Sequence, residues 1–70
     1  MEPIIIVTHG LSGYFAVHMS WNTDLDPEHP ENGFYEPEQS HMFRRRTYEM
    51  ACVDARVWGQ EIGITVELDS

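Results

Sequence analysis

The stretch TYEMACVDARVWGQEIG, residues 47–63, decides the fold, because it is the one segment of this chain with a helical pattern. Thr47 is a good N-cap, since its hydroxyl can accept a hydrogen bond from an amide of the first turn. Gly63 favours the end of the helix, since glycine adopts the left-handed conformation at little cost. At about 100° per residue, one side of this helix carries Tyr48, Ala51, Cys52, Ala55, Trp58, Gly59 and Ile62. We expect that side to pack closely on a sheet.

A second, narrower apolar stripe lies on the other side of the predicted helix. It consists of Met50, Val53 and Val57, and Asp54 and Glu61 border it. One helix cannot bury both sides against one sheet. The stripe therefore either lies beneath a loop at the sheet edge or forms a surface for a partner or for self-association.

Two strands are predicted before the acidic part of the chain. Residues 4–8 form a β-branched run that is apolar on both faces, which is typical of a central strand. Residues 9–13 contain two glycines and predict a turn. Residues 14–21 alternate, so the two segments form a hairpin. We expect the helix to cover Phe15, Val17, Met19 and Trp21, and the outer, partly wet face to carry Tyr14, Ala16, His18 and Ser20.

The rest of the chain completes an α+β fold. Three prolines and an Asn-Gly pair predict an irregular, acidic, Pro-rich loop over residues 22–38. A third strand is expected over residues 39–45 and a final one over residues 64–68. The sequence does not show which strand the last one joins, and a place beside the first strand is preferred. The prediction is a single domain, residues 1–70, with the order β-β-β-α-β. It has a three- or four-stranded, mostly antiparallel sheet with one helix packed on one face.

The charge of the chain is strongly unbalanced. Twelve carboxylates face four basic residues, all arginine, for a net charge of −8. Such a chain should avoid nucleic acid and anionic lipid and be attracted to basic protein surfaces. No apolar run reaches membrane-spanning length, and the start of the chain does not resemble a secretory signal. The single Cys52 excludes an internal disulfide and suits a reducing cytosol.

The acidic loop is the candidate binding site. Its carboxylates are Asp24, Asp26, Glu28, Glu31, Glu36 and Glu38. They either imitate a phosphate backbone for a basic protein surface or form a solvated loop that keeps the protein soluble. We expect the three consecutive arginines, Arg44 to Arg46, to pair with this loop or with neighbouring carboxylates.

No catalytic, metal or cofactor site is predicted. The run from Asp24 to Glu28 lacks the glycine and the final glutamate of a calcium-binding EF-hand loop. The four histidines form no HExxH or His-x-His pair; they are His9, His18, His29 and His41. Cys52 lies in mid-helix on the packing side, which disfavours a reactive thiolate. We therefore predict a protein that is not an enzyme.

Several short motifs resemble a group of small phage-encoded proteins, mostly of unknown function. The motifs are Gly-Tyr-x-Ala-Val, Trp-Asn, Gly-Phe-(Trp/Tyr)-Glu-Pro, Arg-x-x-Thr-x-Glu-x-Ala-x-x-x-Ala-x-x-Trp and a late Gly-Ile. The matching positions span most of the chain: Gly13, Tyr14, Ala16, Val17, Trp21, Asn22, Gly33, Phe34, Tyr35, Glu36, Pro37, Arg44, Thr47, Glu49, Ala51, Ala55, Trp58, Gly63 and Ile64. The resemblance implies a phage or prophage origin and action in the cytoplasm of a bacterial host. It supplies no catalytic residues.

Size, acidity and this resemblance lead to two functional hypotheses. The first is a non-enzymatic protein that binds and inhibits a host nucleic-acid-handling complex through the acidic loop, as anti-CRISPR proteins and DNA mimics do. Its partner would be a basic host protein or nucleoprotein complex, with no direct binding to nucleic acid or membrane. The alternative is a self-associating accessory or structural phage protein, a homodimer built on Met50, Val53 and Val57.

Overall fold

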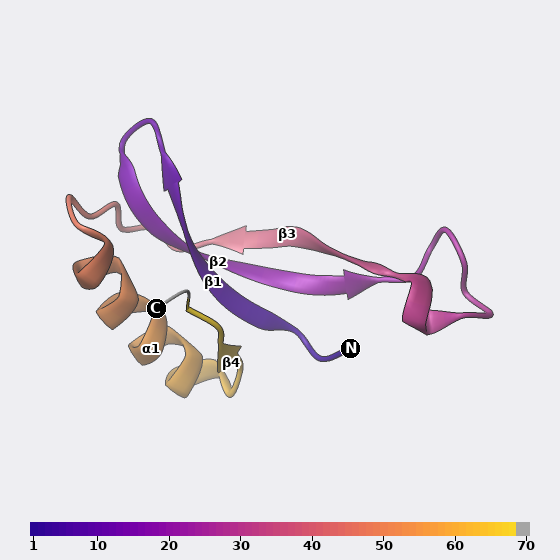
Figure 1. Ribbon diagram of the computed structural model, residues 1–70. Coiled ribbons are helices and arrows are strands. Elements are labelled where there is room, and N and C mark those ends of the chain that lie inside the picture. Colours follow the sequence, from indigo (N-terminus) through magenta and orange to yellow (C-terminus); the bar gives the residue numbers. More distant parts are fainter. Residues whose placement is uncertain (69–70) are drawn as a thin grey trace.

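The computed structural model describes residues 1–68 and confirms a small α+β fold (Figure 1). Strands β1 (Ile4–Gly10) and β2 (Gly13–Asn22) form a hairpin, and the 3-10 turn η1 (Pro30–Asn32) precedes β3 (Phe34–Ser40). Helix α1 (Tyr48–Ile62) leads to the short strand β4 (Thr65–Val66). The sheet order is β3-β2-β1-β4, with β1 antiparallel to β2, β2 antiparallel to β3, and β4 parallel to β1. The central position of the first strand and the place of the last strand beside it are as predicted.

The helix begins and ends where local sequence predicts. The Thr47 hydroxyl accepts from the Met50 amide at 3.3 Å, and Gly63 has a φ of 71°. Close packing at Gly59 explains why this position is small, since a Cβ there would lie 2.5 Å from a methyl of Val66. Ala51, Cys52, Ala55 and Gly59 are the buried residues of α1. Ile62 is an exception to the predicted packing side, since it is 46% exposed.

The helix packs on the face of the sheet opposite to the predicted one. Its core contact joins Ala55 to Ile5 of β1 and Ala16 of β2, and all three are buried. His18 lies on this same face, in edge contact with Trp58. The prediction that Ala16 and His18 form the outer face is therefore wrong. The helix approaches the sheet where side chains are small, since Ala16 permits a closer contact than a large side chain would.

The second face of the sheet carries the larger apolar side chains of β2, which are Phe15, Val17, Met19 and Trp21. Val17 is buried and the other three are half-buried. The guanidinium of Arg44 lies 4.0 Å from the centre of the Phe15 ring and covers part of this face. This second face therefore carries large side chains and contacts the segment after β3, but no helix packs on it (Figure 1).

The third strand starts earlier than predicted. Residues 34–38 belong to β3 and not to the loop, and residues 41–46 form no strand, apart from a single bridge between Arg45 and Tyr14. Pro37 is tolerated because β3 is an edge strand, where a missing amide donor need not break the sheet. The pairing skips Glu38 between the partners of His18 and Met19, which makes Glu38 the extra residue of a β-bulge. Pro37 therefore does not exclude a strand, and the irregular loop is shorter than predicted.

Candidate functional site: an acidic lobe at one end of the molecule

Residues 23–33, the acidic lobe, connect β2 to β3 as a series of tight turns. The amide of Asp26 donates to the carbonyl of Thr23 at 3.0 Å, that of His29 to Asp26 at 3.1 Å, and that of Asn32 to His29 at 2.9 Å. The Asn22 side chain accepts from the amide of Asp24 at 2.7 Å and starts the series. These bonds hold the backbone of the lobe in one shape, so little further ordering is needed for it to bind a partner.

Aromatic side chains fix the lobe to the sheet. The indole N–H of Trp21 donates to the carbonyl of Pro30 at 2.8 Å, and the ring meets Tyr35 edge-on at 4.8 Å. Gly33 is required beside them, because a Cβ there would lie 2.5 Å from the Trp21 Nε1. The Tyr35 hydroxyl donates to the carbonyl of Glu2 at 3.0 Å. Tyr35 thus anchors this end of the sheet, whereas Phe34 is 40% exposed.

Four of the six predicted carboxylates lie in the lobe, Asp24, Asp26, Glu28 and Glu31, whereas Glu36 and Glu38 lie on β3, between the lobe and the helix. Four of the residues are exposed, Asp24, Glu28, Glu31 and Glu38, and two are half-buried, Asp26 and Glu36. Among residues 1–68 the contacts of this set with basic groups are with histidines only. A carboxylate oxygen of Glu31 lies 3.3 Å from Nδ1 of His29, and a carboxylate oxygen of Glu38 lies 3.9 Å from Nδ1 of His18. The Asp26 carboxylate accepts from the Asn32 side chain at 3.2 Å.

The arginines of residues 44–46 lie at the other end, where β3 has ended and α1 begins (Figure 1). Arg45 forms a bidentate ion pair with Asp54 of the helix, at 2.6 and 3.1 Å. The hydrogen bond and the charge of Asp54 raise the pKa of Arg45. The expectation that these arginines pair with the acidic lobe is not met in the described part of the chain, whereas pairing with a neighbouring carboxylate is confirmed by Arg45.

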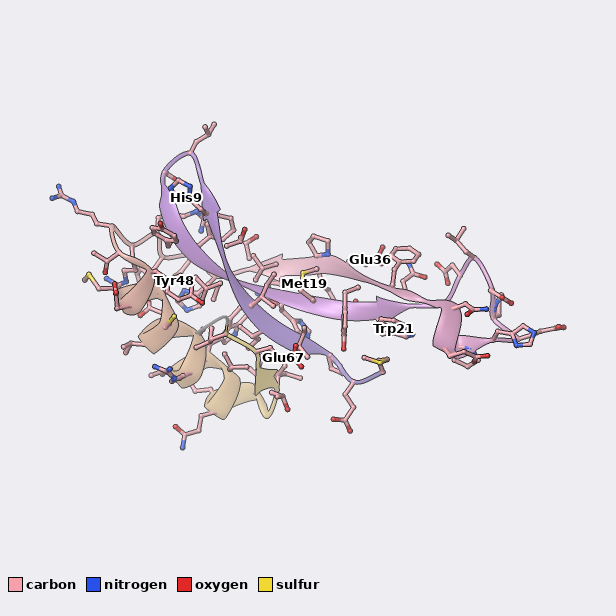
Figure 2. All side chains as sticks on the ribbon, viewed as in Figure 1. His9, Met19, Trp21, Glu36, Tyr48 and Glu67 are labelled. Carbon is pink, nitrogen blue, oxygen red and sulfur yellow. The ribbon has the colours of Figure 1, made fainter. Side chains whose placement is uncertain are left out.

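Charge is therefore separated along the longest dimension of the molecule, which measures 41 Å, whereas the other two dimensions measure 25 and 22 Å. The acidic lobe lies at one end and the three consecutive arginines at the other (Figures 1 and 2). Within the described residues 1–68, the separation leaves the carboxylates of the lobe without arginine partners. They are available to the charges of another molecule.

Leu25 is a second feature of the lobe, and sequence reasoning missed it. It lies between Asp24 and Asp26 and is 83% exposed. The signal was present, because Leu25 is the one aliphatic residue between Trp21 and Phe34. Leu11 and Met42 are comparably exposed outside the lobe, and single exposed apolar side chains are common on proteins. Leu25 is of interest here because it lies among the carboxylates of the lobe.

The predicted helix stripe is exposed. Met50 is 49% exposed, Val53 56% and Val57 53%. The alternative in which an edge loop covers this stripe is therefore wrong. The stripe remains a surface of the molecule.

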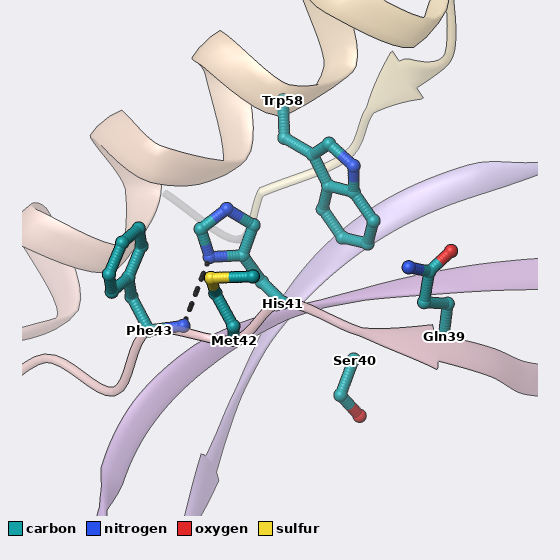
Figure 3. A pocket seen from close by; sticks show the side chains of 6 residues that line it. All are labelled: Gln39, Ser40, His41, Met42, Phe43 and Trp58. Carbon is teal, nitrogen blue, oxygen red and sulfur yellow. Dashed lines mark hydrogen bonds between the residues drawn. The ribbon is translucent and has the colours of Figure 1, made fainter.

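A shallow pocket of about 210 Å³ lies between the end of β3 and the helix (Figure 3). The His41 ring packs at 5.2 Å from Trp58 and 5.4 Å from Phe43, and its Nδ1 accepts from the Phe43 amide at 3.4 Å. The Ser40 hydroxyl points away from this ring (Figure 3). With the histidine held by packing and by its backbone contact, the pocket offers no nucleophile and base in contact.

The other candidate groups for chemistry are dispersed. Among residues 1–68, no three His, Cys, Asp or Glu side chains are grouped so that they could hold a metal ion. Cys52 is buried in the helix packing. His18 has a buried Nε2 without a hydrogen-bond partner in the described structure, and its ring packs on Trp58.

Comparisons with known proteins leave the site to be interpreted from its own chemistry. No protein-family model, curated protein or solved structure matches this chain. Within residues 1–68, the helix is too short and too polar to cross a membrane.

Proposed function

We propose that this protein binds a basic surface of a nucleic-acid-handling protein complex in a bacterial host and competes there with DNA or RNA. The contact set is the six carboxylates of residues 24–38, with Leu25 as an apolar anchor. In this proposal the protein is a phage-type inhibitor that acts by occupying a groove, without catalysis. An arginine- or lysine-lined groove that holds a phosphate backbone is the surface that such a carboxylate set fits best.

One observation carries the proposal: a lobe fixed in shape by turns and aromatic anchors holds four carboxylates, and among residues 1–68 none of them is recorded in contact with an arginine. Crowded carboxylates repel one another, which costs stability unless a partner compensates them. Attraction between the lobe and a basic groove would speed association and make the affinity fall with salt.

The test is capture of host proteins at low salt on immobilised protein, followed by elution with duplex DNA. The expected result is a retained complex that handles nucleic acid, and that DNA and salt displace. A variant with Asp24→Asn, Asp26→Asn and Glu28→Gln should bind this complex roughly 10- to 100-fold more weakly, since each exposed ion pair contributes about 0.5–1 kcal/mol. Leu25→Ser should weaken binding without changing its salt dependence.

The matched control neutralises three exposed carboxylates elsewhere: Glu2→Gln, Glu61→Gln and Glu67→Gln. It changes the net charge by the same amount, so full binding by this control shows that position matters and not total charge. Equal binding by the lobe variant and the wild type would remove the lobe from the mechanism. Retention that DNA does not displace would contradict competition with nucleic acid.

A further inference from the structure

The outer stripe of α1 is the largest exposed apolar feature of the helix. Met50, Val53 and Val57 follow the spacing i, i+3, i+7, which places them in one row along the helix. Each is about half-exposed, and the row faces away from the sheet on which Ala51, Ala55 and Gly59 pack. Such a row is the pattern of a helix that pairs with a second helix.

Two opposite charges border this row on one side. Glu49 and Arg56 lie seven residues apart, about 10 Å along the helix. Both are exposed, and among residues 1–68 the structure records no ion pair for either. Arg56 has no carboxylate three or four positions away in the helix, so its own helix offers it no partner.

The other border of the row is acidic, with Asp54 and Glu61. Asp54 is already paired with Arg45 at 2.6 Å. Only Glu61 remains as an uncompensated charge on that border. Repulsion there is therefore small in a pair of helices that brings these borders together.

We propose that a second copy of this chain docks on this stripe, antiparallel and related by a two-fold axis close to Val53. In this arrangement Glu49 of each copy meets Arg56 of the other, which gives two reciprocal ion pairs beside a row of apolar contacts. A parallel pair would bring Glu49 towards Asp54 of the other copy and Arg56 towards Glu61, so each attraction would be accompanied by a repulsion, whereas both contacts of the antiparallel pair join unlike charges. The antiparallel pair also places the two helix dipoles side by side in opposite directions, so that the positive end of each lies near the negative end of the other. This inference does not depend on the proposed function of the acidic lobe.

The size of the stripe determines how strong the dimer is. Three half-exposed side chains and their charged border make a contact smaller than the standard interface of about 800 Å² per partner. The dimer is therefore weak and depends on concentration. Measurements should extend from about 10 μM to about 1 mM, the range in which weak association becomes visible.

Sedimentation equilibrium of charge variants tests the orientation as well as the surface. Glu49→Arg alone, or Arg56→Glu alone, places like charges at both contacts, so each variant should remain monomeric. A mixture of these two variants should associate at least as well as the wild type, because every contact then joins unlike charges. The chain that carries both substitutions should also recover self-association.

The matched control is Glu28→Arg, which makes the same change of charge in the acidic lobe, far from the helix; it should associate as the wild type does. Val57→Glu should abolish association by placing charge in the apolar row. Circular dichroism verifies that all variants stay folded, as exposed positions should allow. A wild type that is monomeric up to about 1 mM would overturn the proposal. So would single charge variants that associate normally, or a mixture that does not recover.

Discussion

At the scale of single residues, Gly13 fixes the path of the chain after β3. It has a φ of 120°, and a Cβ there would collide with the carbonyl oxygen of Arg45. The neighbouring Tyr14 exchanges two backbone hydrogen bonds of 2.8 Å with Arg45. The close approach at Gly13 lets the irregular segment 41–46 lie against β2, and this segment then places Arg45 beside Asp54.

Gly13→Ala should lower the free energy of unfolding by about 2 kcal/mol or more, because it adds both backbone strain and a clash with a backbone atom. Gly63→Ala is the matched control. Gly63 also has a positive φ, of 71°, but a Cβ there has no atom within 4 Å, so the cost should be about 1 kcal/mol. Urea denaturation compares the two. Equal losses would mean that the contact with Arg45 does not constrain the native protein.

At the scale of elements, α1 is specified almost entirely by its own sequence. Its N-cap, its C-terminal glycine and its packing side are local signals, and the structure places them as predicted except for Ile62, which is exposed. The bidentate pair of Arg45 with Asp54 then attaches the preceding segment to the outer side of the helix. The helix thus connects to the sheet on its inner side and to residues 41–46 at its border.

Removal of the cap tests how much of the helix depends on it. Thr47→Ala should destabilise the protein by about 1 kcal/mol, because the Met50 amide loses its acceptor. Thr47→Ser keeps an oxygen in place and should cost only a few tenths of a kcal/mol. Thermal denaturation followed by circular dichroism measures both. Similar melting temperatures for the alanine and serine variants would show that the bond contributes nothing to stability.

At the scale of the whole molecule, β2 and β3 connect two parts that are stabilised by different interactions. The body is the buried cluster of Ile5, Ala16 and Ala55 with the helix over it. The acidic lobe has no buried residue and depends on turns and on the contacts of Trp21. Local opening of the lobe should therefore require less free energy than unfolding of the body.

Trp21→Phe removes the indole donor to Pro30 while it keeps an aromatic ring against Tyr35. Amide hydrogen exchange should become faster over residues 23–33, and remain unchanged over β1, because only the lobe loses an anchor. Val53→Ala, on the exposed side of the helix, is a control that should leave both regions unchanged. Faster exchange in β1 with Trp21→Phe would show that lobe and body open together.

Patterns between near neighbours in sequence determined the helix with both caps, the central β-hairpin and the acidic character of the loop, whereas the parallel pairing of β4 with β1 joins segments about 60 residues apart. Tertiary structure decided the face of β2 that the helix covers, because β1 is apolar on both faces and small Ala16 allowed the closer approach. It also decided that Pro37 lies in a strand, since an edge position tolerates a residue without an amide donor. The separation of the acidic lobe from the arginines could likewise not be predicted from the composition, because the number of charges does not say where they lie in the fold. Each of these depended on segments distant in sequence meeting in space, which periodicity and turn residues do not encode.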